Sequence, residues 1–152
     1  MKPVKLSRQA SGRNLVVRNL ATSLVLYERI QTTPAKARAA QMHTERLITL
    51  AKKWKLATDP GVKLALRRQM ISRTADKLAV KKLTEVLADL FEKREGGYTR
   101  KIKIGRRLGD AAEQVILSLT ERSNLEVPKP ATKPAKVEKA EKATETKSVE
   151  EK

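Results

Sequence analysis

The sequence predicts an α/β (α+β) domain in which helices pack on one face of a small mixed sheet. Two changes of pattern along the chain lead to this prediction. Apolar residues recur with the helical period of 3.6 through most of residues 13–95, and with the strand period of two over residues 99–104 and 113–120. Covering one face of a small sheet with helices is the simplest way to bury these stripes. The predicted order is helix, strand, three helices, two strands.

The N-terminal half contains two predicted helices joined by a short extended link. The first helix covers residues 13–27, where apolar side chains lie at positions i, i+3, i+4 and i+7. Residues 28–32 follow as a short strand or extended link. Thr33-Pro34 then opens the second helix, with threonine as the N-cap and proline at the first helical position. Its small apolar face continues to about Lys53.

Two further helices precede the predicted strands. Asp59-Pro60 repeats the opening of the second helix, and a shorter third helix follows with apolar residues Val62, Ala65, Leu66 and Met70. The fourth helix begins near Thr74 and is ended by Gly96-Gly97. It has the strongest apolar stripe in the chain, formed by Leu78, Ala79, Leu83, Val86, Leu87, Leu90 and Phe91.

The two predicted strands form an antiparallel pair with a basic loop between them. In the first strand, Ile102 and Ile104 alternate with Lys101 and Lys103. Because successive side chains point to opposite faces of a sheet, we expect the isoleucines to face the core and the lysines to face solvent or a ligand.

Composition divides the chain into three parts. Residues 1–12 form a basic arm without useful periodicity, and residues 13–125 form the predicted domain. Residues 126–152 consist mainly of Lys, Glu, Ala, Thr and Pro, so we expect a disordered tail that cannot bury enough surface to offset its ordering entropy. The seven lysines and six glutamates of this tail nearly cancel, so the positive excess belongs to the arm and the domain.

Charge indicates the class of partner. The 152 residues include 34 Lys and Arg against 17 Asp and Glu, a formal net charge of +17. Such an excess favours a polyanionic partner: RNA, DNA, an anionic membrane surface or an acidic protein. The longest uncharged run, Asn19–Tyr27, is too short to span a membrane, which takes about 20 residues. The N-terminus also lacks the apolar stretch of a secretory signal, so we expect a cytoplasmic protein.

The residue inventory argues against an enzyme. The chain has no cysteine and a single histidine, His43, which has no metal-binding pattern around it and is expected at the surface. Asp110 and Glu113 have no third carboxylate nearby that would complete a metal site. We therefore expect no catalytic residue, no metal, no cofactor and no small-molecule substrate.

The most informative basic cluster covers the first predicted strand and the loop after it. Cations on alternate strand residues lie about 6.6 Å apart and can follow a phosphate backbone. Arginines at the loop tip can form forked contacts with phosphates or reach into a shallow minor groove. The tyrosine at the start of the cluster either stacks on an unpaired base or belongs to the core. The predicted RNA-binding residues here are Tyr98, Arg100, Lys101, Lys103, Arg106 and Arg107.

A second basic cluster lies in the arm and the first helix. It consists of Lys2, Lys5, Arg8, Arg13 and Arg18, and no acidic residue precedes Glu28. Its charges repel one another unless a polyanion is near, and arginines at the start of a helix oppose the positive end of its macrodipole. We therefore predict that these residues bind RNA. Arg38, on the second helix, is a further predicted contact.

Three stretches of the sequence resemble the bacterial-type large-subunit ribosomal protein seventeen family. They are Arg18–Val25 continued by Tyr27–Thr33, Leu47–Lys52, and Gly96–Arg100 followed by Ile104-Gly-Arg and Gly109-Asp-Ala. The Gly-Gly-Tyr-Thr-Arg stretch, in order behind the others, is the most specific match. Together the stretches cover roughly residues 7–120, and the tail after Leu125 extends beyond the usual end of the family.

This resemblance implies an α/β fold and direct contact with large-subunit ribosomal RNA. It also implies a place near the rim of the peptide exit tunnel, beside other ribosomal proteins. The alternative is an architectural DNA-binding protein, for which the charge is equally suitable. The basic residues are spread over an arm, helices and strands and show no helix-turn-helix, which favours embedding in folded RNA.

Overall fold

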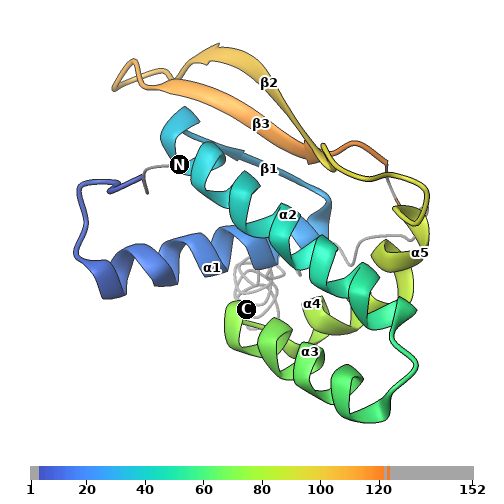
Figure 1. Cartoon of the computed structure of the whole chain (residues 1–152). Helices are drawn as coiled ribbons and strands as arrows, with labels where there is room; N and C mark the ends of the chain where they lie inside the picture. Colours follow the sequence, from blue (N-terminus) through green and yellow to red (C-terminus); the bar gives the residue numbers. More distant parts are fainter. Residues whose placement is uncertain (1–3, 122, 124–152) are drawn as a thin grey trace, which may run out of the picture.

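The computed structural model describes residues 4–121 and 123 of the chain. A three-stranded sheet lies on one side and the helices lie on the other, as Figure 1 shows. In chain order the elements are α1 (Ala10–Tyr27), β1 (Arg29–Thr32), α2 (Pro34–Leu56), α3 (Pro60–Arg73), α4 (Lys77–Lys82), the π-helical turn η1 (Leu83–Leu87), α5 (Ala88–Leu90), β2 (Thr99–Arg106) and β3 (Glu113–Leu119). The predicted α+β class and element order are confirmed, with α4, η1 and α5 in place of one fourth helix.

The sheet is antiparallel throughout, so the prediction of a mixed sheet was wrong. Its strand order is β1-β3-β2. The short loop between β2 and β3 requires an antiparallel pair. The direction of β1 has no such local signal, because helices separate it from β3; it pairs with β3 antiparallel through Ile30↔Leu117 and its neighbours.

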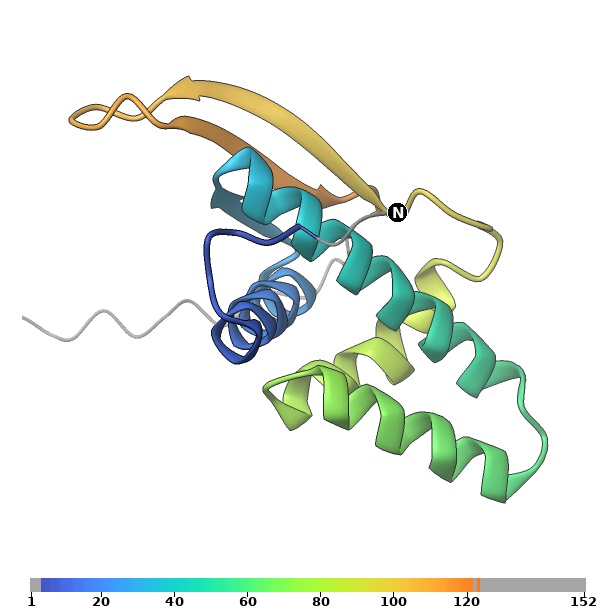
Figure 2. The same ribbon diagram turned by 60° about the vertical axis from the view of Figure 1, so that its left-hand side comes forward.

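Helix α2 forms the centre of the molecule, between the sheet and the remaining helices (Figure 2). Its inward face is buried as predicted, and combines small residues with two larger apolar ones: Ala37, Ala40, Thr44, Leu47, Ile48 and Ala51. The helix begins at Pro34, although the Thr33 side chain forms no capping hydrogen bond, and ends three residues beyond the predicted end. From the sheet, Val115, Leu117 and Leu119 of β3 enter the same core.

The segment from α4 to α5 contains a π-helical turn instead of one regular helix. The Ala88 N–H bonds to the Leu83 carbonyl, five residues earlier. Leu83, Leu87 and Phe91 are fully buried, as the predicted stripe required. Leu78 is 65% exposed, so its assignment to the stripe was wrong.

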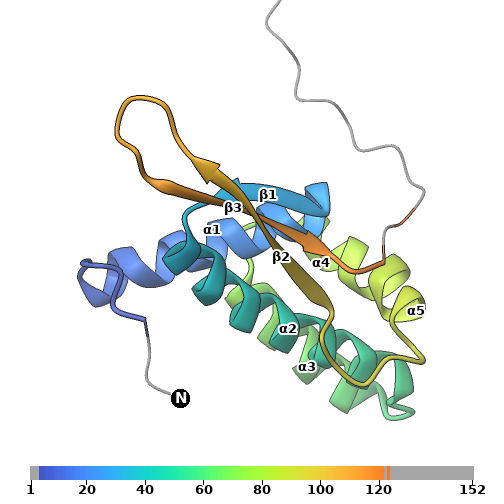
Figure 3. The ribbon, with the colours of Figure 1, turned by 90° about the horizontal axis from the view of Figure 1, so that it is seen from above.

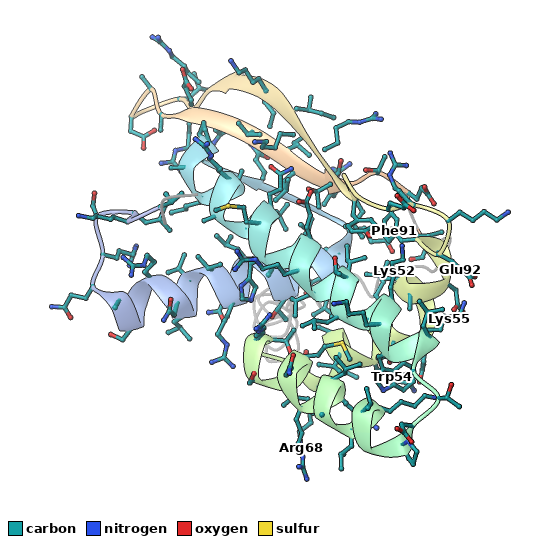
Figure 4. All side chains as sticks on the ribbon, in the orientation of Figure 1. Lys52, Trp54, Lys55, Arg68, Phe91 and Glu92 are labelled. Carbon is teal, nitrogen blue, oxygen red and sulfur yellow. The ribbon has the colours of Figure 1, made fainter. Side chains whose placement is uncertain are left out.

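Helix α3 packs against α2 at the edge of the molecule and leaves much of its own surface uncovered. Met70 is its one buried residue, whereas Val62, predicted on the same apolar face, is 48% exposed. Arg68 points from α3 away from the body of the molecule in Figure 4. The third helix therefore exists where predicted, with a narrower buried face than its sequence indicated.

A buried ion pair joins the end of α1 to α4. Glu28 follows α1 in a left-handed backbone conformation (φ 61°) and its side chain is 5% exposed. Lys82 Nζ lies 2.7 Å from Glu28 Oε1 and donates a second hydrogen bond to the Leu26 carbonyl at 2.9 Å. The backbone N–H of Ser123 donates to Glu28 Oε2 at 3.1 Å, so this carboxylate also holds the segment that follows β3.

Lys55, at the end of α2, is paired with two carboxylates of the α5 region. Its Nζ lies 2.7 Å from Asp89 and 3.0 Å from Glu92, and Figure 4 shows Lys55 and Glu92 side by side. These hydrogen bonds, first to Asp89 and then to Glu92, raise the pKa of Lys55 above its ordinary value. These pairs link the end of α2 to the α5 region.

Candidate RNA-binding surface

Most of the predicted basic residues gather at one end of the molecule. The β2–β3 hairpin projects past the helices, and the starts of α1 and α2 and the N-terminal arm lie toward the same end, on the left in Figures 1 and 3. The arm, the starts of α1 and α2 and strand β2 come from stretches without acidic residues, 1–27, 29–44 and 96–109, whereas the rest of the hairpin contains Asp110 and Glu113. The arm, the helix starts and β2 therefore place cations at this end, where they can attract a polyanion.

Internal ion pairs involve a different set of cations. The lysines and arginines paired with carboxylates of the described residues are Lys55, Lys81, Lys82, Arg94 and Arg107. Of these, only Arg107 was a predicted RNA contact. Most of the basic residues in the described part of the chain form no ion pair with its carboxylates, which is the arrangement expected of a surface that meets external anions.

The register of β2 reverses the predicted faces of its side chains. Lys101 pairs with Leu117 and Lys103 with Val115, and directly opposed residues lie on the same face of a sheet. The two lysines therefore share the face of these core residues, yet both are exposed because β2 is an edge strand. Ile102 pairs with Ile116 on the outer face and is 48% exposed. Ile104 is 50% exposed, so the expectation that Ile102 and Ile104 face the core was wrong.

The hairpin tip is held in one shape by bonds within it. The Arg107 N–H donates to the Ala112 carbonyl at 2.9 Å, and the Ala111 N–H donates to the Arg107 carbonyl at 3.0 Å. The Asp110 carboxylate forms a two-point ion pair with the Arg107 guanidinium and accepts from the Ala112 N–H at 3.2 Å. Gly109 has a φ of 103°, which a residue with a Cβ rarely adopts. Arg107 thus shapes the tip, and Arg106 carries the more available charge.

The Arg107 guanidinium, and next the Ala112 N–H, lower the pKa of Asp110 from 3.8 to about 2. Because the pKa is depressed, the pair contributes fully above pH 3.8 and is lost as the pH falls through about 2. A carboxyl-carbon NMR titration should therefore give a midpoint near 2 for Asp110. In the Arg107→Gln variant the midpoint should rise toward 3.8; the same midpoint in both proteins would contradict the pairing.

A groove of about 930 Å³ lies between α1, α2, the end of α3 and the loop before β2. Arginines from three helices line it: Arg13, Arg18, Arg46 and Arg73. Val17, Met42 and Leu50 add apolar surface, and Glu45 and Glu95 are its two carboxylates. Guanidinium groups bind phosphates in a forked geometry, and the apolar surface suits sugars and bases. The groove is therefore a second place where RNA can bind.

Two side chains in the groove hold α3 in place. The Nε2 atom of His43 lies 2.9 Å from the Arg73 carbonyl oxygen and, since that oxygen only accepts, donates to it. Arg18 Nη2 donates to the Thr74 carbonyl at 2.8 Å. Both bonds satisfy carbonyls at the C-terminal end of α3. Because α1 begins at Ala10, Arg18 lies in mid-helix, and the macrodipole argument for it was wrong.

Tyr98 belongs to the core. Its side chain is 4% exposed and its ring meets Phe91 edge to face with 5.2 Å between centroids. Lys52 Nζ lies 5.7 Å from the centre of the Tyr98 ring. Because only 4% of the Tyr98 side chain is exposed, of the two alternatives for this residue the core position is the one observed.

The other predicted contacts divide between the arm and the helices. Lys5 and Arg8 are exposed in the arm, where the Arg8 N–H bonds to the Lys5 carbonyl, and Arg38 is exposed near the start of α2. Lys2 and the predicted disordered tail lie outside the described residues. Arg46 and Arg73, which complete the groove, were not predicted because residues far apart in the sequence carry no joint signal.

Known proteins match this chain over most of its length. A protein-family model described as ribosomal protein L17 matches residues 16–120. The chain belongs to the ribosomal protein L17 family. It is 45% identical to a Zymomonas mobilis protein over 118 residues, 78% of this chain and 79% of that one. It is 43% identical to a Staphylococcus epidermidis protein over 117 residues, 76% and 96% of the two chains.

A Desulfosudis oleivorans relative is 43% identical over 136 residues, which are 88% of this chain and 62% of that protein. All three relatives are named large ribosomal subunit protein bL17. The L17 match includes α1 from Val16 onward, α2, the groove arginines from Arg18 onward and the β2–β3 hairpin, and it excludes the arm. The predicted resemblance to this family is thereby confirmed, and the family model covers residues 16–120 of the predicted 7–120.

The described residues add two findings of their own. Among residues 4–121 and 123, no three His, Cys, Asp or Glu side chains are grouped so as to hold a metal ion. None of the helices described is long and apolar enough to cross a membrane.

Proposed function

We propose that this protein is a structural constituent of the large ribosomal subunit and binds large-subunit ribosomal RNA through its basic end. The observation that carries the proposal is the gathering of the hairpin, the arm and the starts of α1 and α2 at one end. Cations from separate parts of the sequence lie there, and apart from Arg107 in the hairpin tip the ion-paired cations of the described residues, such as Lys82 and Lys55, belong to other elements. Family membership supports a place in the large ribosomal subunit, since the relatives are named as large-subunit proteins.

Two contact regions carry the binding. The hairpin supplies Arg100, Lys101, Lys103 and Arg106, and the groove supplies Arg13, Arg46 and Arg73. Cations distributed over strands and helices suit phosphates that approach from several directions, as in folded RNA. A DNA-binding architectural protein is the second candidate, and only the net charge supports it. Its DNA contact would need an element that enters one groove, and the sequence shows no helix-turn-helix.

The family resemblance further supports a place near the rim of the peptide exit tunnel, beside other large-subunit proteins, within the cytoplasm. No catalytic step is proposed. The test is co-sedimentation of the tagged full chain from a cell lysate. It should remain with large subunits through salt-washed gradients and leave them after ribonuclease treatment. Recovery with DNA, or release into the light fractions in moderate salt, would contradict the proposal.

Residues 126–152 should be dispensable for assembly, because seven lysines and six glutamates leave them almost neutral and the family match ends at residue 120. A chain truncated after Leu125 should enter large subunits as often as the full chain when the two are co-expressed. The occupancy ratio, measured by quantitative mass spectrometry of purified subunits, should stay near one. A clear excess of the full chain would make the tail a docking element.

A further inference from the structure

The tip of the β2–β3 hairpin presents one leucine to solvent. Leu108 is 98% exposed, the largest exposed fraction among the large apolar side chains of the described residues. An exposed leucine is ordinary on a protein surface. This one is unusual in its place, because the hairpin projects past the helices (Figure 2) and Leu108 lies between Arg107 and Gly109 at its end.

The tip is preorganised around Leu108. The two backbone hydrogen bonds that close the turn and the Arg107–Asp110 ion pair surround this residue in the sequence. Binding through a turn that is already formed costs less ordering entropy than binding through a loose loop. The geometry therefore holds an apolar side chain out from the protein and gives it no partner within the hairpin.

The charges around Leu108 indicate what it meets. Lys101 and Lys103 lie on one face of the hairpin, and Arg100, which pairs with Ser118, lies on the other. A ribbon with cations on both faces suits a crevice with phosphates on both sides. Along β2 a protein partner would meet four cations beside the half-exposed Ile102 and Ile104, whereas the centres of protein interfaces are depleted of charged residues.

We propose that the hairpin enters folded ribosomal RNA and that Leu108 is its apolar wedge, packed against bases while the cations of the stem hold phosphates. Leucine is among the side chains that contact or separate stacked bases from a minor groove, and the minor groove of an RNA helix is wide and shallow. This inference rests on the proposed function, and adds that the tip reads bases where the stem reads only the backbone.

The absence of cysteine makes a direct test possible. Leu108→Cys introduces the single thiol of the full chain, and Leu56→Cys is the matched control, since Leu56 is 75% exposed at the far end of α2. Both thiols should react with a maleimide at similar rates in the free protein. In purified large subunits the thiol of the Leu108→Cys variant should react at least about tenfold more slowly, and that of Leu56→Cys should stay reactive.

A photoactivatable aryl azide on the same thiol identifies the neighbour. Irradiated subunits with the Leu108→Cys variant should yield an adduct to ribosomal RNA, which reverse transcription maps to a base. An adduct to another protein, or undiminished maleimide reactivity in the subunit, would overturn the wedge and leave the proposed function standing. If neither the two variants nor the unsubstituted chain enters large subunits, both the wedge and the proposed function are overturned.

A second variant measures the contribution to binding. Leu108→Ala keeps the turn, which the Asp110 midpoint near pH 2 verifies. Its affinity for large-subunit RNA should fall about tenfold, in keeping with the loss of a buried leucine side chain, with the salt dependence unchanged. Equal affinity for the two proteins would overturn the wedge.

Discussion

Replacing Lys82 by methionine should lower the free energy of unfolding by about 3 kcal/mol. The change removes the cation that lies 2.7 Å from Glu28 and leaves a 5% exposed carboxylate without its charged partner. It also removes the hydrogen bond to the Leu26 carbonyl at the end of α1. Urea unfolding followed by circular dichroism measures the difference.

Lys81→Met is the matched control, because Lys81 is the preceding residue of the same helix. Its ammonium group lies 3.9 Å from Glu85, and both side chains are mostly exposed. Such a pair contributes roughly 0.5 kcal/mol or less. In the double variant Glu28→Gln/Lys82→Met, much of the lost stability should return, because no buried charge is then left unpaired. Equal, small effects of the two lysine variants would show that the Glu28–Lys82 pair does not hold α1 to α4.

Replacing Lys101, Lys103 and Arg106 together by glutamine should reduce the salt dependence of RNA binding. Each phosphate contact contributes roughly 0.7–0.9 to the slope of log affinity against log salt concentration, so three contacts should lower the slope by about 2 to 3. Arg107 is left unchanged because its pair with Asp110 shapes the tip. Filter binding to large-subunit RNA at several salt concentrations gives the slope.

The control replaces Lys133, Lys136 and Lys139, which removes the same formal charge from the C-terminal tail. If net charge alone governed binding, the two triple variants would lose the same slope. A fixed hairpin surface instead predicts almost no effect of the tail variant. Folding has to be compared in parallel, since Lys101 and Lys103 belong to β2, and equal slopes with folding intact would remove the hairpin from the RNA-binding surface.

The elements that the sequence predicted well are those with strong local signals. Thr33-Pro34 and the small residues after it defined α2, the centre of the core. The change to a period of two identified β2 and β3. The short loop that joins them predicted their antiparallel pairing. Both signals arise from neighbours in the chain, so they need no knowledge of the tertiary structure.

The features that the sequence did not predict depend on contacts between distant segments. Alternation showed that Ile102 and Lys101 lie on opposite faces of β2, but only pairing with β3 decides which face is which. Glu28 and Lys82 carry no sign of their pairing. The groove likewise needs α1, α2 and α3 in their final positions, so Arg46 could not be assigned to it in advance.

Ultraviolet cross-linking of intact large subunits, followed by mass spectrometry of the RNA-linked peptides of this protein, is the most direct test of RNA binding by the basic end. The expected result is nucleotide adducts on peptides from the arm, the groove helices and the hairpin, that is residues 4–18, 36–46 and 100–108. Two results would contradict RNA binding by the basic end. One is nucleotide adducts confined to the Asp89–Glu95 region, where carboxylates lie around Lys55. The other is that this protein forms cross-links to proteins only.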